Sequence, residues 1–339
     1  MDIIQQEETD FKMDTNETRR STLVLQQAVL PSLIGLIIAL INLAAILILA
    51  QCKRMNHQIR LMSINLAVTD LMTGVAILID AFLPTMLEEG LCRFLMYFYC
   101  IGVVVSFLTI TGMLVDRFVA LYFPFGYLVL LGKERSLGII LGIWFTGLIL
   151  TAVNFFDGFQ AYQYQDFVIC AQYTVRGKTG LLTVTAIFCF LIVVDVVLYM
   201  LMFIKMYKIS GATSGLETLT REKQFKYQAR ILIKLSAILG CFMLLYTPMI
   251  IINIIDIINT DPSNKRVILT WQSFAGLLVL LNSFINPFLY VWRYTECRYT
   301  FLMIICCCNK NRREKYRKLK KHFFEPYLVQ TSSTAITSK

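Results

Sequence analysis

The sequence is poor in charged residues and in histidine. Only 16% of its 339 residues are charged, whereas 57% are hydrophobic, and the mean hydropathy is +0.64. Soluble domains carry about 25% charged residues, so this composition argues against a soluble fold. The two histidines, His57 and His322, are not accompanied by a nucleophile or by a cluster of metal ligands. The sequence therefore disfavours an enzyme.

Seven apolar runs account for most of the chain. Each is at least as long as the ~20 residues that a helix needs to cross a bilayer. They cover 23–51, 61–87, 94–115, 136–156, 180–204, 235–258 and 267–292. The sequence thus predicts an all-α integral membrane protein, a bundle of seven transmembrane helices. The expected divisions are an N-terminal tail over 1–22, the bundle over 23–292, a short amphipathic eighth helix with a cysteine triplet over 293–308, and a basic tail over 309–339.

The placement of charge predicts the orientation in the membrane. Lysine and arginine concentrate after the first, third and fifth runs and in the C-terminal tail, and acids concentrate on the other side. Because cytoplasmic loops carry the excess of lysine and arginine, we expect the N-terminus outside the plasma membrane and the C-terminus inside. The net charge of +10 follows mostly from this bias, so it does not indicate a nucleic-acid partner. Asn16 begins an N-x-T glycosylation acceptor in the outer tail.

The seventh run carries polar residues that a membrane helix does not need for itself. An unsatisfied polar group in hydrocarbon costs on the order of several kcal/mol, so these groups must face protein, water or an ion. Pro287 must interrupt the helix hydrogen bonds where neighbouring groups can repair the loss. Asp70 is a mid-membrane acid, which by default indicates a functional site. The polar segment reads Asn282-Ser283-Phe284-Ile285-Asn286-Pro287-Phe288-Leu289-Tyr290.

These motifs resemble those of the rhodopsin-like (class A) G-protein-coupled receptors. The seventh-run segment has that family's N-S-x-x-N-P-x-x-Y form, and Asn65 to Asp70 matches N-L-A-x-x-D. Asp116-Arg117-Phe118 stands in place of D-R-Y, and Cys92 lies 25 positions before Arg117. The resemblance covers about 23–308 and implies a receptor that converts binding of an extracellular ligand into activation of a heterotrimeric G protein. Arrestin, receptor kinases and membrane lipid are further partners that it implies.

Departures from the family pattern place the chain near a subgroup. The fifth run has no proline, and Leu191 occupies its usual position. This absence marks the melanocortin, cannabinoid, lysophospholipid and adenosine receptors, and the segment that begins at Leu198-Tyr199 resembles the melanocortin receptors. A Cys92–Cys170 pair is not shared by the melanocortin or lipid receptors.

Cysteine positions suggest three kinds of thiol. The resemblance implies a disulfide between Cys92 and Cys170 on the outer side, where the compartment is oxidising. Three consecutive cysteines after the eighth helix suit S-acylation by palmitate, the alternative being plain cytosolic thiols. The triplet is Cys306, Cys307 and Cys308, and the cysteines expected to remain reduced are Cys52, Cys100, Cys189, Cys241 and Cys297.

A cation site is implied at the depth of Asp70. Carboxylate, hydroxyl and amide oxygens are hard ligands that suit a small hard cation. In the family that this chain resembles, the corresponding residues hold Na⁺ in the resting state. The alternative is a hydrogen-bonded polar network without an ion, and we expect no other cofactor. The set consists of Asp70, Ser106, Asn282, Ser283 and Asn286.

The resemblance also implies an activation switch around Arg117. Asp116 restrains Arg117 at rest, and Tyr199 and Tyr290 are expected to meet it in the active state. Gln228 stands where an acid often provides a second restraint, which predicts basal activity. Further switch residues are Phe242, Pro248, Asn286 and Pro287, and the residues expected to contact the G protein are Arg117, Pro124 and Phe125.

An outer cavity is expected to bind the ligand. Tyr99 stands where amine receptors carry an aspartate, which argues against a monoamine, and the absence of lysine from 267–292 excludes retinal. Asp80 could receive a cationic group or remain a solvated carboxylate. The runner-up function is a seven-helix transporter or channel, but the internal repeats or paired broken helices typical of transporters are missing. The expected lining is Asp80, Tyr99, Cys100, Val103, Thr183, Tyr246, Met249, Ile250, Asn253, Gln272 and Gly276.

Overall fold

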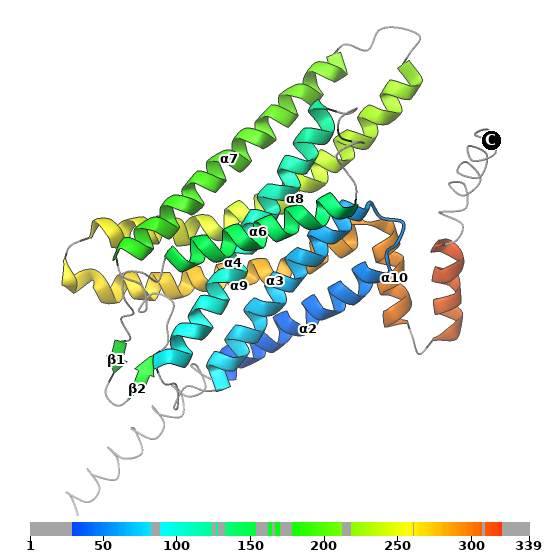
Figure 1. Ribbon diagram of the computed structural model, residues 1–339. Helices are drawn as coiled ribbons and strands as arrows, with labels where there is room; N and C mark the ends of the chain where they lie inside the picture. The colour runs from blue at the N-terminus through cyan, green and yellow to red at the C-terminus, as the bar shows by residue number, and fades with distance from the viewer. Residues whose placement is uncertain are drawn as a thin grey trace, which may run out of the picture.

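Seven long helices form the bundle that the sequence predicts (Figure 1). A computed structural model of the chain describes residues 29–82, 89–123, 127, 133–153, 162–164, 167–169, 178–211, 218–259, 261–306 and 309–320. The seven helices among them are α2 (Leu30–Gln51), α3 (His57–Phe82), α4 (Glu89–Tyr122), α6 (Lys133–Val153), α7 (Lys178–Gly211), α8 (Thr218–Ile258) and α9 (Lys265–Arg293). The short α10 (Thr295–Ile305) follows α9. The predicted fold class is confirmed.

All seven helices are long enough to cross a membrane. Six contain an apolar segment of spanning length, and α6 contains the shorter apolar segment Ser136–Ala152. With its 21 residues, α6 is still about 32 Å long at 1.5 Å per residue, which matches the ~30 Å of the hydrocarbon core. The helix α8 begins well before the apolar run over 235–258, because the preceding segment is rich in good helix formers such as Glu, Lys and Gln.

A short β-hairpin follows α6 in the otherwise helical fold. Its strands are β1 (Tyr162–Tyr164) and β2 (Phe167–Ile169), which pair antiparallel with Tyr162 opposite Ile169 and Tyr164 opposite Phe167. Aromatic and β-branched residues favour strands. The sequence therefore held a signal for this hairpin that the search for apolar helical runs passed over.

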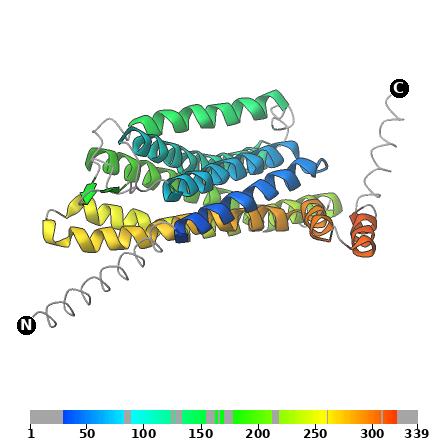
Figure 2. The same cartoon turned by 90° about the horizontal axis from the view of Figure 1, so that it is seen from below.

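The two ends of the bundle carry different features. The Arg117 end is the end at which α4 finishes and α10 begins, and the pocket end is the opposite one, at which α9 begins. The helix α2 begins at the pocket end, and α10 lies at the Arg117 end (Figures 1 and 2). This arrangement is what an odd number of crossings requires.

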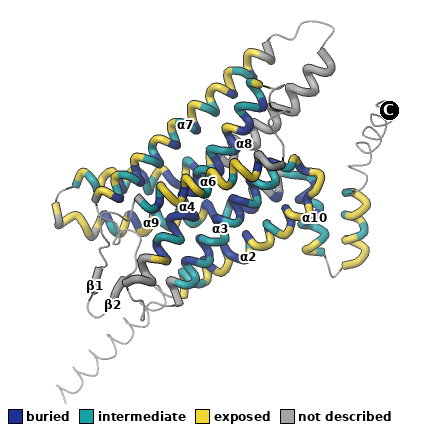
Figure 3. Tube along the Cα trace, in the orientation of Figure 1, coloured by how far each residue is buried: buried dark blue, intermediate teal, exposed yellow. Residues whose placement is uncertain are grey.

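The helix α4 occupies the centre of the bundle and α7 lies at its edge. In the apolar segment of α4, 67% of the residues are buried, against 22% in α7. The helix α4 contacts α3, α6, α7 and α8, and Figure 3 shows buried residues along it. Large apolar side chains of α7 such as Phe190 and Val193 are exposed, as expected of a face that meets lipid.

The helices α2 and α3 approach each other closely at a pair of glycines. A Cβ atom added to Gly74 would lie 2.8 Å from the Ala39 nitrogen and 2.9 Å from the Gly35 oxygen. A Cβ added to Gly35 would lie 2.8 Å from the Gly74 oxygen. Small residues allow membrane helices to pack with their backbones in contact, and here the neighbouring atoms are backbone atoms that cannot move aside.

We predict that Gly74→Ala destabilises the purified protein and that Gly142→Ala does not. Overpacking costs about 1–3 kcal/mol, whereas an added Cβ at Gly142 has no atom within 4 Å. Both changes carry the same gain in helix propensity, about 0.5–1 kcal/mol. The thermal unfolding midpoint in detergent should therefore fall for Gly74→Ala and stay level or rise for Gly142→Ala. Equal midpoints for the two variants would show that α2 and α3 are not in backbone contact.

Candidate functional site

Asp70 joins α3 to α9 in the middle of the bundle. Its side chain is 1% exposed. The carboxylate accepts a hydrogen bond from the Ser283 hydroxyl at 2.7 Å and another from the Asn286 amide at 3.0 Å. Three of the five residues predicted for the cation site are therefore in direct contact. Burying a carboxylate costs free energy that such partners offset, so these contacts hold α9 against α3.

Asn42 repairs the break that Pro287 makes in α9. Proline has no N–H, so in an α-helix the carbonyl four residues earlier loses its partner. For Pro287 this is the Ser283 carbonyl, and the Asn42 amide of α2 donates to it at 3.0 Å. The same amide donates to the Ile38 carbonyl of its own helix at 2.9 Å. The proline thus ties a third helix, α2, to the Asp70 network.

Ser106 and Asn282 complete the set predicted for the cation. Both are buried, and neither the Ser106 hydroxyl nor the Asn282 amide nitrogen has a hydrogen-bond partner among the described residues. The hydroxyl oxygen of Ser106 is therefore available to a ligand. Among the described residues no three His, Cys, Asp or Glu side chains gather to hold a metal. The oxygen donors around Asp70 suit a small hard cation better than a transition metal.

A second polar network, centred on Asn65, joins α3, α4 and α6. The Asn65 amide donates to the Thr109 hydroxyl at 2.8 Å, and the Asn65 carbonyl accepts from the Trp144 indole N–H at 2.8 Å. The Thr109 hydroxyl in turn donates to the Val105 carbonyl at 2.6 Å. The sequence singled out Asn65 through its motif, but no sequence pattern revealed that Trp144 and Thr109 would be its partners.

Arg117 is held in place by two groups at its end of the bundle. It is 8% exposed, and its guanidinium donates to the Asp116 carboxylate from Nε at 2.7 Å and also from Nη2. Nη2 donates to the Tyr127 hydroxyl at 2.6 Å. That hydroxyl donates to the Asp116 carboxylate at 3.2 Å, so each of the three side chains is hydrogen-bonded to the other two. The sequence predicted the Asp116 contact and missed Tyr127.

Aromatic rings pack one on another through the centre of the bundle. Phe242 is fully buried, meets Phe107 edge-on at 4.4 Å between ring centroids, and stacks on Tyr246 at 4.2 Å. Phe188 of α7 stacks on Phe107 at 5.1 Å. Contacts of this kind are worth about 0.5–1.5 kcal/mol beyond the burial of their area. Tyr246 of α8 is thus in ring contact with Phe107 of α4 and Phe188 of α7.

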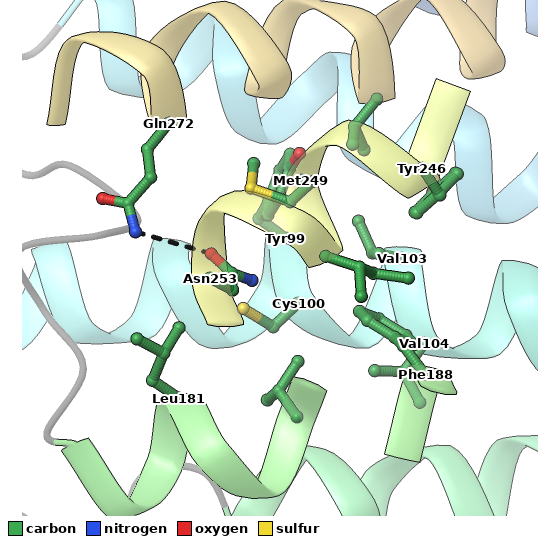
Figure 4. Close-up of a pocket in the computed structure, with 13 residues that line it drawn as sticks. Tyr99, Cys100, Val103, Val104, Leu181, Phe188, Tyr246, Met249, Asn253 and Gln272 are labelled. Carbon is green, nitrogen blue, oxygen red and sulfur yellow. Dashed lines mark hydrogen bonds between the residues drawn. The ribbon is translucent and has the colours of Figure 1, made fainter. Parts of the chain in front are cut away.

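A cavity of about 50 Å³ lies between α4, α7, α8 and α9 at the pocket end (Figure 4). Eight residues predicted for the ligand line it, and the sequence missed five apolar ones. The predicted ones are Tyr99, Cys100, Val103, Tyr246, Met249, Ile250, Asn253 and Gln272. The missed ones are Val104, Leu181, Val184, Phe188 and Val279.

Two residues predicted for the ligand lie away from this cavity. The Thr183 hydroxyl donates to the Thr179 carbonyl of its own helix at 2.8 Å, and Thr183 does not line the cavity. Gly276 does not line the cavity either, although a Cβ added to it would lie 3.8 Å from the methyl group of the lining residue Met249. The predicted lining is wrong for these two. Asp80 lies in α3, but its side chain is outside the described residues.

The cavity has one polar side, formed around Gln272. The Gln272 amide donates to the Asn253 carbonyl at 3.4 Å and to the Asp256 carboxylate at 3.2 Å (Figure 4 shows the first). Lys265 donates to the same carboxylate at 2.7 Å. The Gln272 carbonyl oxygen is buried and has no partner among the described residues. In Figure 4 this oxygen points away from the other labelled lining residues, and the amide nitrogen points toward Asn253.

The sequence comparison agrees with this geometry. The chain matches the family described as 7 transmembrane receptor (rhodopsin family) over residues 41–290. The protein belongs to this family. It is 23% identical to melanocortin receptor 3 of Homo sapiens over 290 residues, which are 81% of this chain and 84% of that receptor. It is 25% identical to the glucose-dependent insulinotropic receptor of Homo sapiens, over 80% of this chain and 83% of that receptor. It is 24% identical to the allatostatin-A receptor of Bombyx mori, over 81% of this chain and 78% of that receptor.

Membership of the family sets the class of function. The chain is a rhodopsin-family receptor that signals through a G protein in response to an extracellular ligand, and it is a multi-pass membrane protein. Its relatives are receptors rather than enzymes. The transporter or channel interpretation is not favoured.

Several residues predicted for the receptor fall outside the described part of the chain. The backbone of Tyr290 and of Cys92 is helical, but their side chains are not part of what the structure describes. Tyr199 is described and half-buried, and it packs against the apolar cluster that contains Leu114 and Met202. Cys306 lies in a turn after α10. Entirely outside are Asn16, Pro124, Phe125, Cys170, Cys307 and Cys308.

Proposed function

We propose that this receptor lies in the plasma membrane with its pocket end outside, couples to a heterotrimeric G protein at its Arg117 end, and signals in part without ligand. The observation that carries the proposal is the buried Arg117, held by Asp116 and Tyr127. The orientation is supported by Lys53, Arg54 and Arg60, which follow α2 at the Arg117 end. Cytoplasmic loops are enriched in such cations.

Restraint and release of Arg117 provide the switch. In the arrangement described here, the guanidinium is neutralised by Asp116 and capped by Tyr127. When the helix ends separate, Arg117 can leave these partners and face the G protein together with Pro124 and Phe125. Ligand shifts the population toward that arrangement in proportion to its differential affinity. Gln228 cannot act as an acidic second restraint, so part of the population is active without ligand.

The cavity indicates the kind of ligand that the receptor accepts. A drug-sized site has a volume of about 300–1,000 Å³, so a cavity of about 50 Å³ must enlarge to enclose one. Binding would then displace Met249 or Tyr246, and through Tyr246 the aromatic rings below it. The lining is mostly apolar, and the Gln272 carbonyl lacks a donor. The ligand therefore has an apolar body and a polar group that meets the Asn253 and Gln272 side of the cavity.

The residues around Asp70 would hold Na⁺ in the resting receptor. Asp70, Ser106 and Ser283 would supply a carboxylate and two hydroxyl oxygens, and Asn282 and Asn286 would supply amide oxygens. The unpartnered Ser106 hydroxyl supports this assignment. A bound cation supplies positive charge that offsets the buried carboxylate. The hydrogen bonds among Asp70, Ser283 and Asn286 hold α3 and α9 in one relative position.

The remaining proposals concern processing and later partners. A disulfide Cys92–Cys170 would secure the outer end of α4, and Asn16 would carry a glycan. Palmitate on Cys306, Cys307 and Cys308 would anchor the chain to membrane lipid beyond α10. Receptor kinases would act on the cytoplasmic side, and arrestin would then compete with the G protein for the Arg117 end.

We predict that sodium stabilises the receptor through Asp70. The thermal unfolding midpoint should rise when NaCl replaces KCl at constant ionic strength, with a gain of about 1.4 kcal/mol at ten times the Kd. In Asp70→Asn the sodium titration should be flat. The matched control is Asp195→Asn, which removes another fully buried carboxylate, and it should respond as the parent does. A sodium response in Asp70→Asn equal to that of the parent would refute the site.

We predict that the receptor catalyses nucleotide exchange on a heterotrimeric G protein without ligand. Two variants should change the exchange rate in opposite directions. Tyr127→Phe removes a hydrogen bond to a charged group, worth about 1.5–3 kcal/mol, and should raise the exchange rate several-fold. Gln228→Glu gives Arg117 an acidic partner and should lower the rate. The controls at matched expression are Tyr207→Phe, an exposed tyrosine, and Gln224→Glu, which adds the same charge one turn away.

Two outcomes would contradict this account of basal signalling. If the parent, Tyr127→Phe and Gln228→Glu all leave exchange at the level of membranes without receptor, ligand-free signalling does not occur. If both variants match their controls in an active receptor, the activity does not depend on the restraint of Arg117.

A further inference from the structure

A buried pair of thiols lies where α2 meets α10. Cys52 directly follows the last residue of α2, and Cys297 lies in the first turn of α10. Both are 0% exposed. The Cys297 thiol donates to the Cys52 sulfur with the two Sγ atoms 2.6 Å apart, although the residues are 245 positions apart in the sequence. The Cys52 thiol donates to the Ile48 carbonyl at 3.2 Å.

One contact joins the two segments independently of the thiols, and others hold each segment to a neighbouring helix. The Arg54 backbone N–H donates to the Glu296 carboxylate at 3.0 Å, and the Arg60 guanidinium donates to the Cys52 carbonyl at 3.3 Å. Lys320, from the helix over 310–320, donates to the Thr300 hydroxyl at 2.9 Å and lies 3.7 Å from Glu296. The thiols are thus placed in contact by their surroundings.

The environment makes the two sulfurs chemically unequal. The hydrogen bond from Cys297 lowers the pKa of the Cys52 thiol. The same hydrogen bond, followed by burial, raises the pKa of the Cys297 thiol. Because the thiolate is the reactive form of cysteine, Cys52 is the nucleophile of the pair and Cys297 the resolving thiol.

We propose that Cys52 and Cys297 form a reversible disulfide that locks α10 to the end of α2 when a peroxide is present. The S–S bond of a disulfide is about 2.05 Å long, so the two sulfurs need to approach by only about half an ångström. Peroxide is nearly as small as water, and Lys320 covers the junction with a side chain that is 22% exposed. Opening of that contact gives access to the pair.

The reaction balances with hydrogen peroxide as the two-electron oxidant. The Cys52 thiolate attacks one peroxide oxygen, the O–O bond breaks, and protonation of the departing hydroxide gives water and a Cys52 sulfenic acid. The Cys297 sulfur then attacks the Cys52 sulfur, the S–O bond breaks, and a second water leaves. Two thiols and one peroxide become one disulfide and two waters. Glutathione, the cytosolic thiol, reverses the reaction by thiol–disulfide exchange.

The test uses the purified full-length receptor and does not depend on its signalling. The protein is treated with hydrogen peroxide, its remaining thiols are alkylated, and its peptides are mapped by mass spectrometry without reduction. A peptide pair joined through Cys52 and Cys297 should appear and should disappear after treatment with glutathione. Cys297→Ser should abolish the pair, and the control Cys241→Ser should leave it unchanged.

A second measurement covers the case in which a variant folds poorly. In the parent, oxidation should raise the thermal unfolding midpoint by several degrees, because the new bond closes a loop of 245 positions, and glutathione should reverse the rise. Recovery of Cys52 and Cys297 as alkylated thiols or as separate oxidised acids after peroxide treatment would overturn the proposal. A rise in the midpoint without the linked peptides would also overturn it.

Discussion

The bundle depends on how one buried carboxylate is satisfied. Asp70 accepts hydrogen bonds from Ser283 and Asn286 of α9, and the carbonyl that Pro287 leaves without a partner is taken by Asn42 of α2. In hydrocarbon none of these groups can turn to water. The proline, the acid and the amides are therefore only tolerable together, and together they fix α2, α3 and α9 in one relative position.

The fixed arrangement of α2, α3 and α9 is the reference against which α8 and Arg117 can move. α9 carries Gln272 at the cavity and Asn286 in the polar network, so a ligand that contacts Gln272 acts on the helix that Asp70 holds. The helix α8 reaches the same region through Tyr246 and Phe242, which pack on Phe107 of α4. The helix α4 also carries Arg117, near its end at Tyr122, so it connects the rings packed beside the cavity with the Arg117 end, and two discrete arrangements of this connection are what signalling requires.

Sequence patterns could predict those hydrogen-bond partners that the chemistry of a buried group requires. A mid-membrane acid must find donors, and Ser283 and Asn286 were the donors at its depth. The same patterns could not predict Tyr127 on Arg117, Trp144 on Asn65, or Cys52 on Cys297, because these depend on the rotation of each helix about its axis. Thr183 was predicted to line the cavity and does not. A threonine in a helix can donate its hydroxyl hydrogen bond to the carbonyl four residues earlier, so it need not point into the cavity. The hairpin was missed because its strands are only three residues each.

The most direct test of this account is a double-mutant cycle between α3 and α9. The thermal unfolding midpoints of Asp70→Ala, Asn286→Ala and the double variant are compared with that of the parent under the same salt conditions. If the two side chains hold the helices together by direct contact, each single variant loses the shared interaction, and the double variant falls by clearly less than the sum of the two. Shifts that simply add would mean that Asp70 and Asn286 act independently, and the frame described above would not exist.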